Sequence, residues 1–121
     1  MRQISALLPF LLAASSSALS VELCPATERE LKGAWGRSGD SGFFEEFLLE
    51  TDAGSNIFNS WLHHRPELSG AWRLENCRLV VTSGVFAPFR LKILDIHQDK
   101  LRIYDESDQM ESVYVRLPDA R

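Results

Sequence analysis

Residues 67–75 read Glu-Leu-Ser-Gly-Ala-Trp-Arg-Leu-Glu, and core-forming and polar positions alternate along the whole stretch. Side chains of a β-strand point alternately to its two faces, so this alternation predicts a strand with one face in a core and the other in water. The core face would carry Leu68, Gly70, Trp72 and Leu74.

The same period of two continues through most of the chain, between turns rich in Gly, Asp, Asn, Ser and Pro. The pattern predicts strands at 33–37, 43–51, 55–63, 67–75, 77–82, 89–96, 100–104 and 112–117. We therefore expect an all-β fold, a small antiparallel up-and-down meander of about eight strands. Closure into a barrel is expected because it leaves no exposed strand edge.

Three local features refine this expectation. Leu94 follows Ile93 directly, and the inward set then becomes Leu94 and Ile96, which is what one inserted residue, a β-bulge, would produce. Residues 98–99 are expected to form a tight hairpin turn. A short helical turn is expected at 25–33, with a proline in its first turn and a glycine at its end.

The amino terminus has the pattern of a secretory signal peptide over residues 1–20: one basic residue, an apolar run and then small residues. Cleavage is expected after Ala18 or Ser20, which leaves a single domain at 21–121. The apolar run is near ten residues where a spanning helix needs roughly 20. No small residue precedes Cys24, so we expect no lipid anchor, and the mature chain is expected in the periplasm or outside the cell.

Cys24 and Cys77 are the two cysteines of the chain. In an exported protein an even count predicts a disulfide bond rather than a metal or redox site, and no CxxC pair occurs. On the chain-entropy model, closing a loop of this size stabilises the fold by roughly 4 kcal/mol.

The formal charge excludes one class of partner. The chain carries 13 basic and 17 acidic residues, a net of -4, and removal of the leader takes away Arg2 and no acid. Attraction to a phosphate backbone requires the opposite sign, so no nucleic-acid partner is expected. We expect the mature protein to be a monomer.

The pentapeptide at 31–35, Leu-Lys-Gly-Ala-Trp, ends the helical turn and begins the first strand. Together with the meander that follows, it resembles the lipocalin-like, or calycin, proteins, in which a G-x-W frame starts the first strand. The resemblance implies structural roles. Gly33 would let the helical turn pass close beneath the barrel, Trp35 would plug the closed end, and Arg116 of the last strand would lie over the indole ring.

Small bacterial lipocalin-like domains often carry a second Gly-x-Trp strand in the middle of the chain, and residues 70–72 resemble it. Gly70 and Trp72 would then also be structural. The resemblance implies a binding protein for a small apolar molecule, with Phe58, Trp61 and Phe86 near any mouth of the barrel.

A protein-binding module, of the inhibitor or immunity type, is the alternative interpretation. It would use exposed aromatic residues and the acidic residues Asp105, Glu106 and Asp108 against a basic partner. The interior decides between the two, because large inward side chains leave no room for a ligand and move function to the surface. The inward set is mostly Leu, Ile, Val and Trp, which favours a filled barrel.

A metal site is not expected. His63, His64 and His97 could combine with Asp95 or Asp99, since imidazole and carboxylate suit zinc or copper. Adjacent histidines on a strand point to opposite faces, however, so the first two cannot easily bind one ion.

Catalysis is not expected either. The sequence has no G-x-S-x-G, H-E-x-x-H or P-loop motif and no cysteine left over as a nucleophile. We expect no catalytic residue and no cofactor. Glu45 is the one acid whose facing matters: if Phe43, Phe47 and Leu49 face inward, strict alternation buries its carboxylate with them. We favour a local bulge that turns Glu45 outward over a buried functional carboxylate.

Overall fold

The computed structural model describes residues 24–84 and 86–118, so the expected leader at 1–20 lies outside the described residues. A single helical turn, α2 (Glu28–Leu31), leads into eight strands. They are β1 (Gly33–Arg37), β2 (Glu46–Asp52), β3 (Ser55–Leu62), β4 (Arg65–Glu75), β5 (Arg78–Ser83), β6 (Phe89–His97), β7 (Lys100–Asp105) and β8 (Met110–Arg116).

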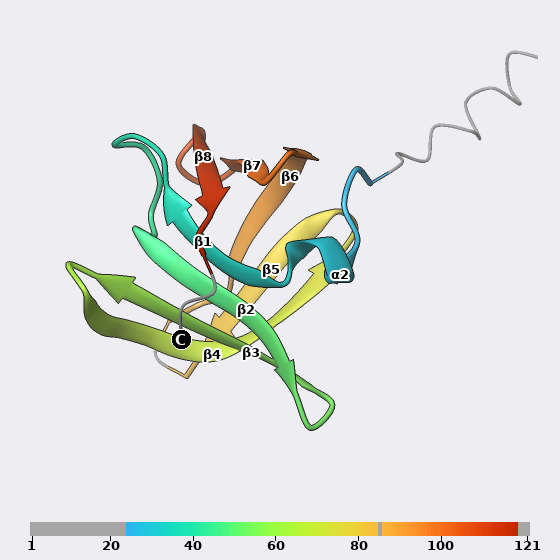
Figure 1. Cartoon of the computed structure of the whole chain (residues 1–121), viewed down its shortest axis with the longest axis vertical. Coiled ribbons are helices and arrows are strands. Elements are labelled where there is room, and N and C mark those ends of the chain that lie inside the picture. The colour runs from blue at the N-terminus through green and yellow to red at the C-terminus, as the bar shows by residue number, and fades with distance from the viewer. Residues whose placement is uncertain (1–23, 85, 119–121) are drawn as a thin grey trace, which may run out of the picture.

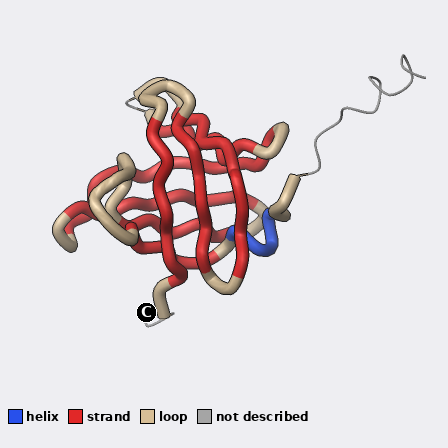
Figure 2. Tube along the Cα trace, turned by 90° about the horizontal axis from the view of Figure 1, so that it is seen from above, coloured by secondary structure: helices blue, strands red, loops and turns tan. Residues whose placement is uncertain are grey.

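Each strand pairs antiparallel with the next, and β8 pairs with β1, so the sheet closes into a barrel (Figure 1). In Figure 2 the strands nearest the viewer run across those behind them, as in a barrel whose two walls cross. The all-β meander expected from the alternation is confirmed, and the closed architecture is consistent with a calycin-like fold.

The interrupted register of β6 is confirmed. Its pairing with β7 shifts between Ile93 and Asp95, so one inserted residue restores the inward facing of the rest of the strand. Residues 98–99 form the expected tight turn, with both φ angles positive as in a type I′ hairpin. A second shift, between Ser60 and Trp61 in the pairing of β3 with β4, was not apparent in the sequence.

The expected strand at 43–51 is wrong at its start. β2 begins at Glu46, and in the loop before it Phe43 is exposed while Phe44 is buried. Phe44 and Phe47 both enter the core although they are three residues apart, which strict alternation does not allow. An irregular backbone segment before β2 therefore shifts the alternation of inward and outward side chains.

Smaller corrections concern element ends. β4 begins at Arg65 rather than at residue 67, and Cys77 lies in the turn before β5. The helical turn begins at Glu28, later than the proline suggested. Thr27 caps it in a capping box: its Oγ1 accepts from the Glu30 backbone N–H, and the Glu30 carboxylate accepts from the Thr27 backbone N–H.

Because the strands alternate in direction, the connections divide into two groups at opposite ends of the barrel. The helix end carries α2 and the turns at 53–54, 76–77 and 98–99. The loop end carries the connections at 38–45, 63–64, 84–88 and 106–109. In Figure 1 the helix end lies to the right and the loop end to the left.

Arg116 and Trp35 close the helix end. The Arg116 guanidinium lies 4.4 Å from the centre of the Trp35 ring and donates to the carbonyl oxygens of Lys32 and Glu30 at 2.6 and 2.8 Å. The Trp35 indole N–H donates to the Leu31 carbonyl at 2.8 Å. These bonds satisfy carbonyls that the short helix leaves without partners.

Two glycines permit close backbone approach. Gly33 has a φ of 131°, and a side chain there would meet the Arg116 guanidinium. A side chain at Gly70 would meet the backbone carbonyl oxygen of Thr82 on the paired strand. Each glycine is thus required by the packing of its neighbours.

The expected disulfide bond is confirmed: Cys24 is bonded to Cys77 across a sequence separation of 53 residues. It joins the segment before α2 to the turn between β4 and β5, at the helix end. Trp72, in β4 before this turn, is buried and donates from its indole to the Glu50 carbonyl at 3.1 Å.

Large side chains fill the barrel interior. The Phe47 ring lies 4.9 Å from Tyr114 and 6.0 Å from Phe58, and Phe44 lies 5.1 Å from Phe58. Residues with at most 3% exposure extend this packing to the helix end; they include Trp35, Leu49, Trp72, Leu79, Val81, Leu91, Ile93, Leu101 and Ile103. The interior is therefore a packed core.

Candidate functional site at the loop end

Four large apolar side chains are exposed among the described residues, and all four lie at the loop end. They are Phe43, Leu62, Phe86 and Met110, with exposed fractions of 49%, 40%, 53% and 36%. Each belongs to a different connection or to the strand residue beside it. Single exposed apolar residues are ordinary, but their concentration at one end of a small barrel is typical of an interaction surface.

A pocket of about 570 Å³ opens at this end. It is lined by Phe43, by the segment from Phe86 to Arg90, and by Asp105, Ser107 and Asp108 at the end of β7 and in the turn after it. The Phe89 ring lies 4.8 Å from Phe43 and 6.4 Å from Phe86, so three aromatic rings form one continuous apolar wall. We call the pocket that these three rings line together with Arg90, Asp105 and Asp108 the loop-end pocket.

Phe44 separates this pocket from the interior. Its ring contacts Phe43 and Phe89 at 5.0 and 5.2 Å on the pocket side and Phe58 at 5.1 Å on the core side. The Tyr114 hydroxyl donates to the Phe44 carbonyl at 2.6 Å. Burial raises the pKa of Tyr114 above its ordinary value of 10.0, so the hydroxyl keeps its proton and this bond across the physiological range.

Both signs of charge border the loop-end pocket. The Asp105 carboxylate accepts from the backbone N–H groups of Ser107 and Asp108 at 3.0 and 3.3 Å, which fixes the turn. Arg90, the basic lining residue, lies 3.7 Å from the Glu75 carboxylate. The Asp105 carboxylate is therefore held by backbone groups of its own turn. Arg90, in contrast, is engaged by Glu75, which is not a lining residue of the pocket.

The long loop between β1 and β2 is held by hydrogen bonds, although it lacks regular structure. The Arg37 guanidinium donates to the carbonyl oxygens of Gly39 and Gly42 at 3.1 and 2.9 Å. The Ser41 hydroxyl donates to the Glu111 carbonyl at 2.8 Å. Phe43 is thus displayed from an anchored segment, which lowers the entropic cost of ordering it on binding.

Glu45 is not a buried functional carboxylate. It accepts a hydrogen bond of 2.6 Å from the His63 backbone N–H, and its side chain is 37% exposed. That hydrogen bond lowers the pKa of Glu45 below its ordinary value of 4.5. The contact joins the loop before β2 to the turn between β3 and β4.

The structure separates the three residues expected to line a mouth. Phe58 is fully buried, so it belongs to the packed core rather than to a surface pocket. Trp61 lies on the opposite face of β3 from Phe58 and is half-buried. Phe86 alone lines the loop-end pocket, although contacts through Phe89 and Phe44 connect it to Phe58.

Sequence reasoning did not single out Phe43, Leu62 and Met110 as a group. Each of the three stands in or next to a connection, and in an up-and-down meander alternate connections lie at the same end of the barrel. The strand order alone therefore indicates that these residues share one end. The β1–β2 loop contains Gly39 and Gly42, and the phase of a strand cannot be extrapolated back through such a segment.

The candidate metal ligands are not brought together. His63 and His64 occupy the turn between β3 and β4, whereas His97 ends β6 at the opposite end of the barrel. Asp95 lies 3.9 Å from Arg102, and Asp99 pairs with Arg116 at 3.0 Å. Within residues 24–84 and 86–118, no three His, Cys, Asp or Glu side chains are grouped to hold an ion.

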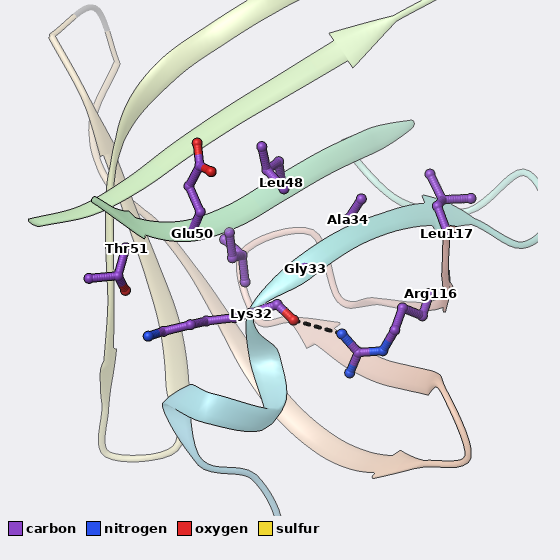
Figure 3. A pocket seen from close by; sticks show the side chains of 9 residues that line it. Lys32, Gly33, Ala34, Leu48, Glu50, Thr51, Arg116 and Leu117 are labelled. Carbon is purple, nitrogen blue, oxygen red and sulfur yellow. Dashed lines mark hydrogen bonds between the residues drawn. The ribbon is translucent and has the colours of Figure 1, made fainter. Parts of the chain in front are cut away.

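A second pocket, of about 590 Å³, lies on the outer wall against β1 and β2 (Figure 3). Ala34, Leu48 and Leu117 form its apolar part, and Lys32 extends along its edge. Its other basic residue, Arg116, is directed at the Lys32 carbonyl oxygen and serves the closure of the helix end. We therefore take the loop-end pocket as the candidate site.

No family model, curated protein sequence or solved structure matches the chain. Among the described residues, no helix is long and apolar enough to cross a membrane.

Proposed function

We propose that the mature chain is a secreted or periplasmic binding module that contacts another protein through the loop end of its barrel. One observation carries this proposal: the four exposed large apolar side chains of the described residues gather at that end. A contiguous apolar surface with a polar border is a common feature of protein contact sites.

The filled interior supports a role for the surface. A lipocalin-like carrier would hold its ligand inside the barrel, but here that space is packed with aromatic and aliphatic side chains. The ring of Phe44, with 1% exposure, lies between the loop-end pocket and the core. Entry of a ligand would require this packing to be broken, at a cost of several kcal/mol.

The disulfide bond supports export. Bonds of this kind persist in oxidising compartments, and Cys24 stands close behind the expected leader. The mature chain then works outside the cytosol, where a partner would be another exported or surface protein.

A small apolar molecule in the loop-end pocket is a second candidate function, favoured by the pocket itself. Its volume of about 570 Å³ lies within the range of sites for small ligands, roughly 300–1,000 Å³. The ligand would lie at the mouth, against Phe43 and Phe86, rather than in the interior.

Native mass spectrometry of the mature protein purified from its own host tests both candidates. We expect the wild-type chain to retain a second protein, the Phe86→Asp variant to lose it, and the matched Ala53→Asp variant at the helix end to keep it. Retention of a small-molecule mass by the wild type, lost with Phe86→Asp, would establish the second candidate instead. A bare chain in all three samples would contradict both.

A further inference from the structure

We propose that the loop-end pocket recognises a lysine or arginine side chain of the partner protein. This inference rests on the proposed function and names the chemistry of the contact. Its basis is the combination of three aromatic rings with two carboxylates in one pocket.

The apolar wall suits an organic cation as well as an apolar group. Phe43, Phe86 and Phe89 form one wall, with the rings of Phe43 and Phe89 tilted by 40° to each other. The face of an aromatic ring attracts a cation placed within about 6 Å of its centre. The alkyl stem of lysine or arginine would pack along the same rings while its charged head reached the edge of the pocket.

The acidic residues of the same lining complete this chemistry. Asp105 and Asp108 line the pocket, and the Asp105 carboxylate is oriented by two backbone N–H groups of its own turn. A guanidinium held over the rings would face these two acids. An anion would face them too, and would be repelled.

The basic residues nearby are directed to other acids. Arg78 holds Glu106 with two hydrogen bonds of 2.8 and 3.0 Å, which lowers the pKa of Glu106. Arg90 lies 3.7 Å from Glu75. Arg78 is not among the lining residues. Arg90 lines the pocket and is engaged by Glu75, so two lining acids stand against one lining cation, and the chain as a whole is acidic, with a net charge of -4.

The occupant is a residue of a protein rather than a free small cation because the exposed surface extends beyond the pocket. Met110 follows the turn that carries Asp108, and Leu62 lies beside the contact between Glu45 and His63. A free amine would cover only the pocket, whereas a basic side chain on a protein surface would bring neighbouring apolar groups against Leu62 and Met110.

Three blocked peptides serve as probes: acetyl-Gly-Arg-Gly-amide, acetyl-Gly-Gln-Gly-amide and acetyl-Gly-Glu-Gly-amide. Each is titrated into the oxidised mature protein while amide chemical shifts are recorded. We expect the arginine peptide to shift the amides of Phe86, Phe89 and Asp108, with an affinity at least threefold above that of the glutamine peptide, and the glutamate peptide to bind most weakly.

Two matched variants locate the charge effect. Asp108→Asn is expected to lower the affinity for the arginine peptide about threefold, in the range of an exposed ion pair. Asp52→Asn, an exposed acid at the helix end, is expected to leave it unchanged. Loss of the aromatic ring in Phe86→Leu is expected to lower the affinity while the site stays apolar.

Equal affinities for the arginine and glutamine peptides, or shifts confined to residues outside the pocket, would overturn this inference. So would the absence of saturable binding by any peptide. If Phe86→Asp still abolishes the complex with the partner protein in that case, the proposed function stands. Only the inference that the pocket recognises a lysine or arginine side chain is then wrong. Cation-selective binding in the pocket without a protein partner would support cation recognition by the pocket, but would refute the proposed function and with it a protein as the source of the cation.

Discussion

Replacement of Arg116 by alanine removes the group that ties together the helix end of the barrel. Its guanidinium donates to two carbonyls of the α2 segment, those of Glu30 and Lys32, and to the Asp99 carboxylate at 3.0 Å. It also lies over the Trp35 ring. Arg116 thereby joins the α2 segment to β8, so the change should loosen the helical turn.

The expected loss is about 3 kcal/mol of the free energy of unfolding. Each bond to a carbonyl contributes about 1 kcal/mol net. The cation–π contact contributes about 0.5–1 kcal/mol at a partly exposed site. The pair with Asp99 adds little, because that carboxylate is 73% exposed and surface ion pairs are worth about 0–1 kcal/mol.

Urea unfolding of the oxidised protein, followed by tryptophan fluorescence, measures this loss. The matched control is Arg102→Ala, which removes surface pairs with Glu111 and Asp95 and should cost no more than about 1 kcal/mol. The melting temperature of the Arg116→Ala variant should fall by roughly 12–24 °C on the scaling for domains of this size. Equal losses in the two variants would refute the role assigned to Arg116.

Three further predictions concern stability. Cys24→Ser should destabilise the oxidised protein by about 4 kcal/mol in urea unfolding, and an unchanged transition midpoint would exclude the bond. Gly70→Ala should cost about 2 kcal/mol or more, because the added methyl group meets a backbone carbonyl of β5, whereas Gly84→Ala in open space should be tolerated. The pKa of Glu106 is lowered by its hydrogen bonds with Arg78, so this pair stabilises the fold above the ordinary carboxyl pKa of 4.5, and the effect is lost as the pH falls through the lowered value. Calorimetry should show a lower melting temperature for Glu106→Gln than for the wild type at pH 7 and equal melting temperatures at pH 2. A difference in melting temperature that grows as the pH falls would contradict this pH dependence.

The alternation of side chains was sufficient to predict the strands and the closed meander, because one buried face imposes a period of two. It also located the bulge in β6, where Ile93 and Leu94 break the period in a segment that is otherwise regular. The second irregularity, opposite Ser60, lies where β4 continues through Pro66 and Glu67. The pairing skips Glu67, which stands at the expected start of the strand, so no break within an alternating segment marks it.

The candidate site was harder to predict because it depends on loops. The facing of Phe43 and Phe44 is decided by the backbone of the β1–β2 loop, which Arg37 holds through bonds to carbonyl oxygens. Such bonds do not depend on which side chains the loop carries, so they leave no pattern in the sequence. Phe58 was expected near a mouth because the sequence does not show that Phe44 covers it.

Photo-crosslinking in the host tests most directly whether the loop end is the functional surface. A photoreactive phenylalanine analogue is placed at Phe86, and in a matched strain at Ala53 of the helix end, and the exported protein is irradiated in intact cells. If the loop end is the functional surface, position 86 yields one discrete crosslinked protein and position 53 yields none. Crosslinks of equal yield from both positions, or from position 53 alone, would contradict it.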